Sequence, residues 1–231
     1  MAIEAIFFDL DDTIHDSQFP FEHTVEKLLP EVAAGFDMNT LYKKFREASD
    51  WLWKDYVDGT ISLSDLRTRR IMIALESIDI SIDTGTAQAF QQQYERNQGQ
   101  LKMFSEVPSV MEALKEKEIL VGMITNGPVE HQHRKISSLG LTSHIPANLI
   151  FVSDGVGVAK PNPDIFHHVR ERINILPQRI LYVGDSWEND IVGPSLAGWQ
   201  SVWFNHRKRE PETNHNPLAV IHNLSSILEY V

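Results

Sequence analysis

Three carboxylates follow directly on an apolar run near the start of the chain. Residues 5–8, Ala-Ile-Phe-Phe, have the composition of a short strand that is buried on both faces. Asp9, Asp11 and Asp12 come next. Clustered carboxylates repel one another and lose solvation when buried, so they do not stabilise a fold by themselves. A solvated acidic turn is the alternative, but acids at the carboxyl end of a strand indicate a ligand site that a divalent cation could neutralise.

Polar groups also follow or flank three later apolar runs. The run at 120–124 ends in a Thr-Asn-Gly turn at 125–127, where a hydroxyl and backbone N–H groups could hold phosphate oxygens. Lys160 stands before two prolines, which restrict the loop that carries its ammonium. The run at 180–183 ends in the acidic stretch 184–190. Taken singly, each segment is also compatible with an ordinary strand-to-helix turn or a solvated lysine.

These four segments resemble, in order, the four motifs of the haloacid-dehalogenase-like (HAD) hydrolase superfamily. The first family motif has the form D-x-D-x-T after the first strand, and Asp9, Asp11 and Thr13 match it. The Thr of 125–127 matches the second motif, K-P-x-P at 160–163 the third, and G-D-S-x-x-N-D at 184–190 the fourth. The resemblance spans essentially the whole chain, and four motifs in a consistent context are a far more specific signal than one.

The resemblance implies a role for each motif residue. Asp9 would be the nucleophile that forms an aspartyl-phosphate, and Asp11 would be the general acid and then the general base. A Mg²⁺ cofactor would offset the negative charge of the substrate. This cation prefers oxygen ligands, which the carboxylates supply. The remaining implied sites are phosphate-binding Thr125, Asn126 and Lys160, the metal ligands Asp9, Asp11 (through its backbone carbonyl) and Asp185, and the supporting residues Asp190 and Asn189.

The pattern of elements predicts an α/β fold. Apolar runs at 120–124, 149–152, 180–183 and 200–204 alternate with helical spacing, which is typical of a Rossmann-like parallel sheet with helices on both faces. A strand at 219–221 and a helix at 225–231 are expected at the end. We expect 1–16 and 105–231 to form the hydrolase core.

Residues 17–104 are predicted to form an inserted helical cap domain, as many HAD phosphatases have. Helical spacing predicts four helices there. The first runs through Val25 and Val32 and ends at Gly35, and the second runs from Leu41 to near Gly59. The third has Ser64 as its N-cap, and the fourth covers 87–94. Family caps cover the active site and select substrates.

Composition restricts the partners. The 231 residues contain 21 Lys and Arg against 32 Asp and Glu, a formal charge of −11, which argues against a nucleic-acid polymer or an anionic membrane as partner. No cysteine is present, so disulfides and thiolate chemistry are excluded. Without an apolar run long enough to span a bilayer, we expect a soluble, cytoplasmic protein. The sequence does not indicate an oligomeric state.

The motifs leave several activities open. A haloacid dehalogenase has the same nucleophile, but a halide leaves without a proton and without a metal, so Asp11 and Asp185 would have no purpose. A phosphomutase or phosphotransferase differs only in the phosphoryl acceptor. A non-catalytic binding homologue should have lost a motif acid, and none is missing; a phospho-Asp receiver domain is much shorter. We therefore favour a Mg²⁺-dependent phosphatase.

The sequence says less about the substrate. An enclosed site under a helical cap favours a small soluble phosphomonoester. Aromatic and arginine side chains at 51–70 favour a nucleoside monophosphate slightly, because bases stack on such groups. A sugar phosphate or phosphoglycolate is almost equally compatible.

Overall fold

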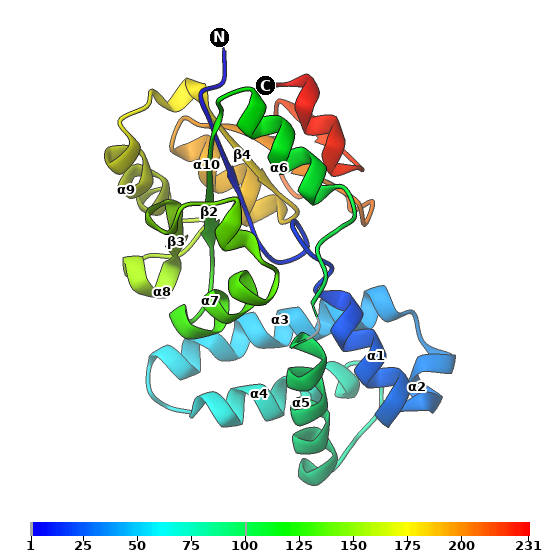
Figure 1. The fold of residues 1–231 in the computed structure, drawn as a ribbon. Helices are drawn as coiled ribbons and strands as arrows, with labels where there is room; N and C mark the ends of the chain where they lie inside the picture. The colour runs from blue at the N-terminus through cyan, green and yellow to red at the C-terminus, as the bar shows by residue number, and fades with distance from the viewer. Residues whose placement is uncertain (1, 100) are drawn as a thin grey trace. The chain divides into compact units, whose positions relative to one another are not determined.

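A six-stranded parallel sheet carries the motif segments in the computed structural model, which describes residues 2–99 and 101–231. The strand order is β3-β2-β1-β4-β5-β6 (Figure 1). This is the α/β fold that the sequence predicts. The strands are β1 (Ala5–Phe8), β2 (Leu120–Thr125), β3 (Ile150–Val152), β4 (Ile180–Gly184), β5 (Gln200–Phe204) and β6 (Ala219–Ile221).

Strand β1 lies in the middle of the sheet and is buried on both faces. All four of its side chains are 0% exposed, which explains its continuous apolar composition. Phe7 pairs in register with Gly122 of β2, and a Cβ at Gly122 would lie only 2.1 Å from the Phe7 ring. The glycine therefore provides the space that the aromatic ring fills.

Helices cover both faces of the sheet. Figure 1 shows α6 and the C-terminal segment on one side and α9 on the other, where Phe166 packs among Phe7, Tyr182 and Trp199. The C-terminal segment is a 3₁₀ helix. The helical elements are α6 (Val107–Glu116), α7 (Val129–Ser138), η1 (Leu141–Ser143), η2 (Ala147–Leu149), α8 (Ser153–Val156), α9 (Asp164–Ile173), η3 (Pro177–Arg179), the π-helix η4 (Trp187–Val192), α10 (Gly193–Leu196) and η5 (Leu224–Glu229).

The chain divides into two units: Met1–Asp16 with Lys102–Val231, which contains the sheet, and Ser17–Leu101. The second unit is helical. Its aromatic core includes Phe21, Phe45 and Phe90, all 0% exposed. Its helices are α1 (Gln18–Leu28), α2 (Pro30–Gly35), α3 (Met38–Val57), α4 (Leu63–Glu76) and α5 (Thr84–Gln98).

Two expectations for this helical unit are wrong. The helix expected through Val25 and Val32 is two helices, so the described residues contain five helices here instead of four. Pro30 causes the break, because it has no N–H to donate and disfavours a helical conformation at Leu29, whose φ is −136°. The N-cap of α4 is Ser62 and not Ser64: Ser62 Oγ accepts from the Asp65 N–H at 3.0 Å, and Asp65 Oδ2 accepts from the Ser62 N–H at 3.1 Å.

In the described residues, no helix has the length and apolar composition needed to cross a bilayer.

Replacing Gly122 by Ala tests the contact with Phe7. The added methyl group should clash with the ring and lower the free energy of unfolding by about 1–3 kcal/mol. Urea denaturation followed by circular dichroism measures this loss. Adding Phe7→Leu to the variant should recover part of the lost stability. Gly35→Ala serves as the control, because a Cβ at Gly35 would meet no neighbouring atom within 4 Å. A Gly122→Ala protein as stable as the wild type would contradict the packing argument.

Candidate active site

The carboxyl ends of three adjacent strands carry the candidate site. Because β1 lies between β2 and β4, the strands that end in Thr125 and directly before Asp9 and Asp185 are neighbours in the sheet. The Asp9 N–H donates to the Val183 carbonyl at 2.9 Å, so β1–β4 pairing continues up to the first acid. Parallel strands end at the same edge of a sheet, which is why residues far apart in the sequence meet here.

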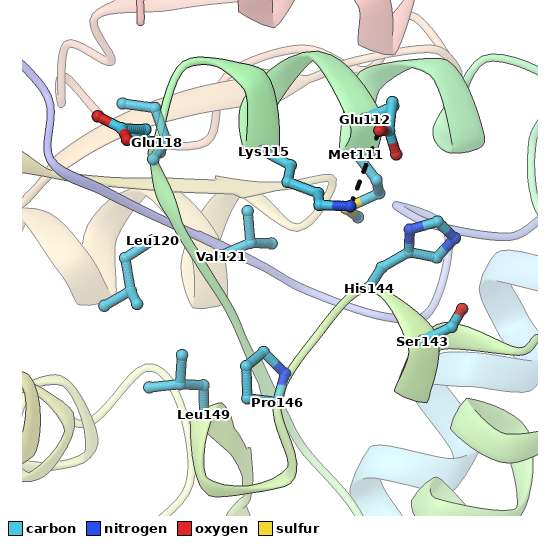
Figure 2. Close-up of a pocket in the computed structure, with 11 residues that line it drawn as sticks. Met111, Glu112, Lys115, Glu118, Leu120, Val121, Ser143, His144, Pro146 and Leu149 are labelled. Carbon is cyan, nitrogen blue, oxygen red and sulfur yellow. Dashed lines mark ion pairs between the residues drawn. The ribbon is translucent and has the colours of Figure 1, made fainter.

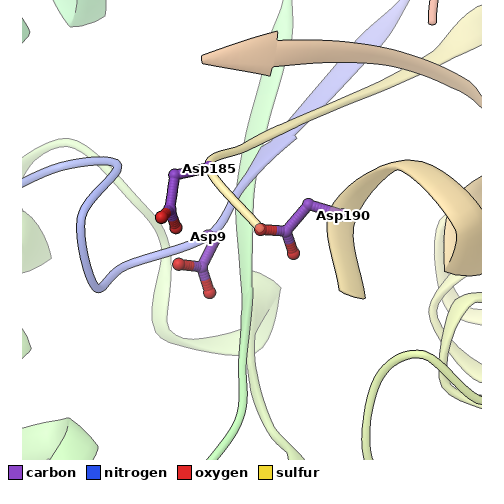
Figure 3. A group of neighbouring side chains, drawn as sticks. All are labelled: Asp9, Asp185 and Asp190. Carbon is purple, nitrogen blue, oxygen red and sulfur yellow. The ribbon is translucent and has the colours of Figure 1, made fainter. Parts of the chain in front are cut away.

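Three carboxylates form a buried cluster at this edge. Oxygens of Asp9, Asp185 and Asp190 all lie within 4.8 Å of one another (Figure 3). Asp9 is 7% exposed and Asp190 is 0% exposed. Asp190 can approach β4 because residue 184 is glycine: a Cβ there would lie 2.2 Å from Asp190 Oδ2.

Lys160 is the cation of the cluster. Its Nζ donates to Asp9 Oδ1 at 2.8 Å, to Asp190 Oδ1 at 2.6 Å and to the Tyr182 hydroxyl at 2.8 Å. Asn126 holds the lysine loop, because its Oδ1 accepts from the Lys160 N–H at 3.0 Å and its Nδ2 donates to the Lys160 carbonyl at 2.9 Å. The amide of Asn126, expected at the phosphate, therefore binds the backbone of Lys160.

Ser186, the N-cap of η4, keeps the Asp190 side chain in place. The Ser186 N–H donates to Asp190 Oδ2 at 2.9 Å, so both carboxylate oxygens of Asp190 are bound. Asn189 contributes through its backbone N–H, which donates to Ser186 Oγ at 3.4 Å. These two supporting residues thus shape the loop after β4.

Lys160 and Arg209 do not fully neutralise the three carboxylates. Burial raises the pKa of Asp9 to about 6; Lys160 opposes the shift, and Asp190 and Asp11 add to it. Burial also raises the pKa of Asp185 well above its usual range, with Asp12 adding to the effect and Arg209 opposing it. Both shifts mean that the nearby positive charge does not offset the cost of burying the ionised carboxylates of Asp9 and Asp185. A hard divalent cation fits this all-oxygen donor set.

Asp11 is held by side chains that the sequence analysis did not select. Lys135 Nζ lies 2.7 Å from both Asp11 oxygens, Gln132 Nε2 donates to Oδ2 at 3.1 Å, and His15 Nε2 lies 3.1 Å from Oδ1. Gln132 also donates to Thr125 Oγ1 at 2.5 Å. Lys135 and Gln132 are polar residues on the buried face of α7, and that amphipathic mismatch was the available signal.

Two arginines reach the acids from the loop after β5. Arg207 Nη2 lies 2.8 Å from Asp12 Oδ1 and 2.7 Å from Asp16 Oδ1, and Arg209 Nη1 lies 3.0 Å from Asp185 Oδ2. The sequence predicts only a polar loop here. Nothing local marks these arginines, because their partners are far away in the sequence.

A cavity of about 430 Å³ lies beside the beginning of β2, so it is not at the carboxylate cluster, which follows the strand ends. Figure 2 shows Lys115 and Glu112 of α6 on one side and His144 and Pro146 on the other. The Lys115–Glu112 pair, at 3.9 Å, is exposed, and no acid–base pair is buried here among the lining residues described. The carboxylate cluster is therefore the better candidate for catalytic chemistry.

Known proteins are similar to this chain over the segments that form the candidate site. A family model of haloacid dehalogenase-like hydrolases matches residues 3–198. Glyceraldehyde 3-phosphate phosphatase of Methanopyrus kandleri is 28% identical over 205 residues, covering 87% of this chain and 83% of that protein. Pyrimidine 5'-nucleotidase YjjG of Escherichia coli is 27% identical over 223 residues, covering 92% and 91%.

A solved structure shares the fold over the whole chain. The putative HAD-hydrolase YfnB of Bacillus subtilis, bound to magnesium, superposes with a TM-score of 0.73 at 24% identity, covering 99% of this chain and 98% of that one. The region matched by the family model contains every strand-end segment of the candidate site.

Proposed function

Because the chain belongs to the haloacid dehalogenase-like hydrolases, we propose that it is a Mg²⁺-dependent phosphatase acting on a small soluble phosphomonoester through an aspartyl-phosphate. One observation carries this proposal. Asp9 stands at the carboxyl end of the central strand, bound to Lys160 and within 4.8 Å of two further acids. Thr125 and Asp11, which both accept a hydrogen bond from Gln132, would supply the phosphate ligand and the proton carrier.

Asp9 is the proposed nucleophile. Lys160 binds its Oδ1, so we assign the attack on phosphorus to Oδ2. A bond forms between this oxygen and phosphorus while the bond from phosphorus to the ester oxygen breaks. Thr125 Oγ1, at the end of β2, and the ammonium of Lys160 would stabilise the phosphoryl oxygens as charge moves between them.

Asp11 is the proposed proton carrier. It would give a proton to the ester oxygen as the alcohol leaves. In the second step a water molecule attacks the phosphorus of the aspartyl-phosphate, and Asp11 takes a proton from that water. Asp9 then regains its carboxylate and inorganic phosphate is released. The two carboxylates thus divide nucleophilic and proton-transfer work between them.

The metal site would use the oxygens of Asp9 and Asp185 and the backbone carbonyl of Asp11. When bound, Mg²⁺ supplies positive charge that offsets the repulsion between a carboxylate and a phosphate. Three observations support the assignment: the oxygen-only cluster, the raised pKa values of Asp9 and Asp185, and the magnesium in the related YfnB structure. Asp190, which is engaged by Lys160 and Ser186, is better suited to support the lysine.

The names of the relatives support a small soluble phosphate ester as the substrate. The motif residues act on the phosphoryl group alone, so residues outside them must discriminate between esters. In the helical unit, Trp51 on α3 is 64% exposed, and an exposed indole is a group on which a base can stack. We therefore propose a nucleoside monophosphate first and a sugar phosphate second.

Replacement of Asp9 by Asn tests the nucleophile. The variant should lose turnover of p-nitrophenyl phosphate by at least about a thousandfold, because an amide does not form the covalent intermediate. Release of p-nitrophenolate in the presence of Mg²⁺ measures this loss, and circular dichroism checks the fold. Glu171→Gln, which removes an exposed carboxylate from α9, is the control and should retain activity. Substantial turnover by the Asp9→Asn enzyme would refute the assignment.

Binding of Mg²⁺ should weaken in acid. A carboxyl group with a pKa of about 6 is mostly protonated at pH 5, and the cation must displace that proton. Asp9 alone should therefore weaken the affinity roughly tenfold between pH 7.5 and pH 5, and Asp185 should add to this effect. Isothermal titration calorimetry with Mg²⁺ at the two pH values measures the change. Equal affinities at both pH values would place the metal elsewhere.

A phosphate-release screen tests the substrate. With Mg²⁺ present, kcat/KM should be higher for nucleoside monophosphates than for sugar phosphates or phosphoglycolate. Release of phosphate and alcohol in equal amounts would distinguish hydrolysis from transfer to another acceptor. A clear preference for sugar phosphates over every nucleotide would contradict the nucleotide assignment and leave the phosphatase assignment intact.

A further inference from the structure

Helix α7 places two polar side chains against Asp11, although its residues belong to none of the four motifs. Gln132 is 1% exposed and Lys135 is 8% exposed. They are three residues apart, so they lie on the same face of the helix. Lys135 Nζ contacts both carboxylate oxygens of Asp11 at 2.7 Å, and Gln132 Nε2 contacts Oδ2 at 3.1 Å.

We propose that Lys135 and Gln132 are positioning residues that hold the carboxylate of Asp11 where it exchanges protons with the leaving oxygen and the attacking water. This inference rests on the phosphatase function proposed above. Neither residue needs to touch the substrate, because both act through Asp11.

Stability alone does not explain Lys135. Withdrawing an ammonium from water is costly, and a buried ion pair often stabilises a fold no better than apolar residues of similar size. Among the residues described, Asp11 is the only carboxylate within ion-pair distance of this lysine. Its side chain is thus directed at the one acid that the proposed reaction uses for proton transfer.

Asp11 is a residue that needs such support. It stands in the turn after β1, where the next residue, Asp12, has a positive φ of 61°. A proton carrier works only within hydrogen-bond reach of the reacting oxygen, and a carboxylate on a turn has several rotamers to choose from. An ammonium that contacts both oxygens restricts that choice more than a contact to one oxygen would.

Gln132 links Asp11 to the phosphate site. Its Nε2 donates to Asp11 Oδ2 and also to Thr125 Oγ1, so a single amide nitrogen contacts the proton carrier and the proposed phosphate ligand. Gly127 makes room for this side chain: a Cβ there would lie 3.3 Å from Gln132, and the φ of +140° already favours glycine. Gln132 thereby restricts the distance between the Asp11 carboxylate and the Thr125 hydroxyl.

The test compares Lys135→Met with three related enzymes. Lys135→Met keeps the length of the side chain and removes its charge, and Lys135→Arg keeps the charge. Arg134→Met makes the same change of charge at the exposed neighbouring position on α7 and is the matched control. Circular dichroism and urea denaturation show whether Lys135→Met folds. If it does not, Gln132→Met tests the positioning of Asp11 instead.

We expect Lys135→Met to lower kcat on an alkyl phosphate by roughly ten- to a hundredfold, part of what general acid–base catalysis contributes. The loss on p-nitrophenyl phosphate should be smaller, because its leaving group needs little protonation. KM and the inhibition constant of orthovanadate should stay within about threefold of the wild type, since phosphate contacts persist. Lys135→Arg should recover part of kcat, and Arg134→Met should match the wild type.

A double-mutant cycle distinguishes positioning from general structural support. In an Asp11→Asn background, Lys135→Met should cause no further loss of kcat, because the group that it positions is already inactive. Additive losses would overturn the inference, as would wild-type kcat in Lys135→Met. A rise in KM and in the vanadate constant with kcat unchanged would instead make Lys135 a phosphate ligand. A wild-type enzyme without phosphatase activity would refute the proposed function, which is a separate outcome.

Discussion

The buried ammonium of Lys160 is the interaction on which the rest of the site depends. It is 5% exposed and donates to Asp9, Asp190 and Tyr182. Burial by itself lowers the pKa of Lys160, but the attraction of Asp190 and Asp9 outweighs burial and raises that pKa well above its usual range. A charge withdrawn from water must be paired, so the loop that carries Lys160 is tied to the ends of β1 and β4.

Tyr182 extends this tie across the sheet. Its hydroxyl accepts from Lys160 and donates to the Ile124 carbonyl at 2.7 Å, which connects β4 to β2. Burial raises the pKa of Tyr182 well above its usual range, so the phenol stays neutral and keeps the proton that it donates. Small residues permit the close approaches: Gly122 accommodates Phe7, and Gly184 accommodates Asp190. Close packing and charge pairing therefore both favour the same arrangement of the strands and of the Lys160 loop.

The helical unit has its own source of stability. Phe21, Phe45 and Phe90 form an aromatic cluster with ring centroids 4.8–6.1 Å apart. The Arg70 guanidinium lies 4.4 Å from the centroid of the Phe45 ring, and burial lowers the pKa of Arg70 to about 10.

Residue composition and order along the chain were enough to predict the sheet and the strand-end motifs. Strands β1, β2 and β4 are short, mostly apolar runs; Thr125 ends β2, and Asp9 and Asp185 directly follow β1 and β4, so local composition and order were sufficient. Local patterns also explain the two differences in the helical unit: Pro30 separates α1 from α2, and the Ser62–Asp65 pair begins α4.

Which side chains bind the acids depends on contacts between segments that are far apart in the sequence. Lys135 and Gln132 meet Asp11 from more than 120 positions away, and Arg207 meets Asp12 from 195 positions away. The helical pattern of α7 shows at most that two polar residues lie on its buried face, and nothing local marks Arg207. Which acid each side chain meets depends on where the sheet places a helix or a loop. The chain order therefore indicates which carboxylates could react, whereas the packing of α7 and of the loop after β5 determines how they are held.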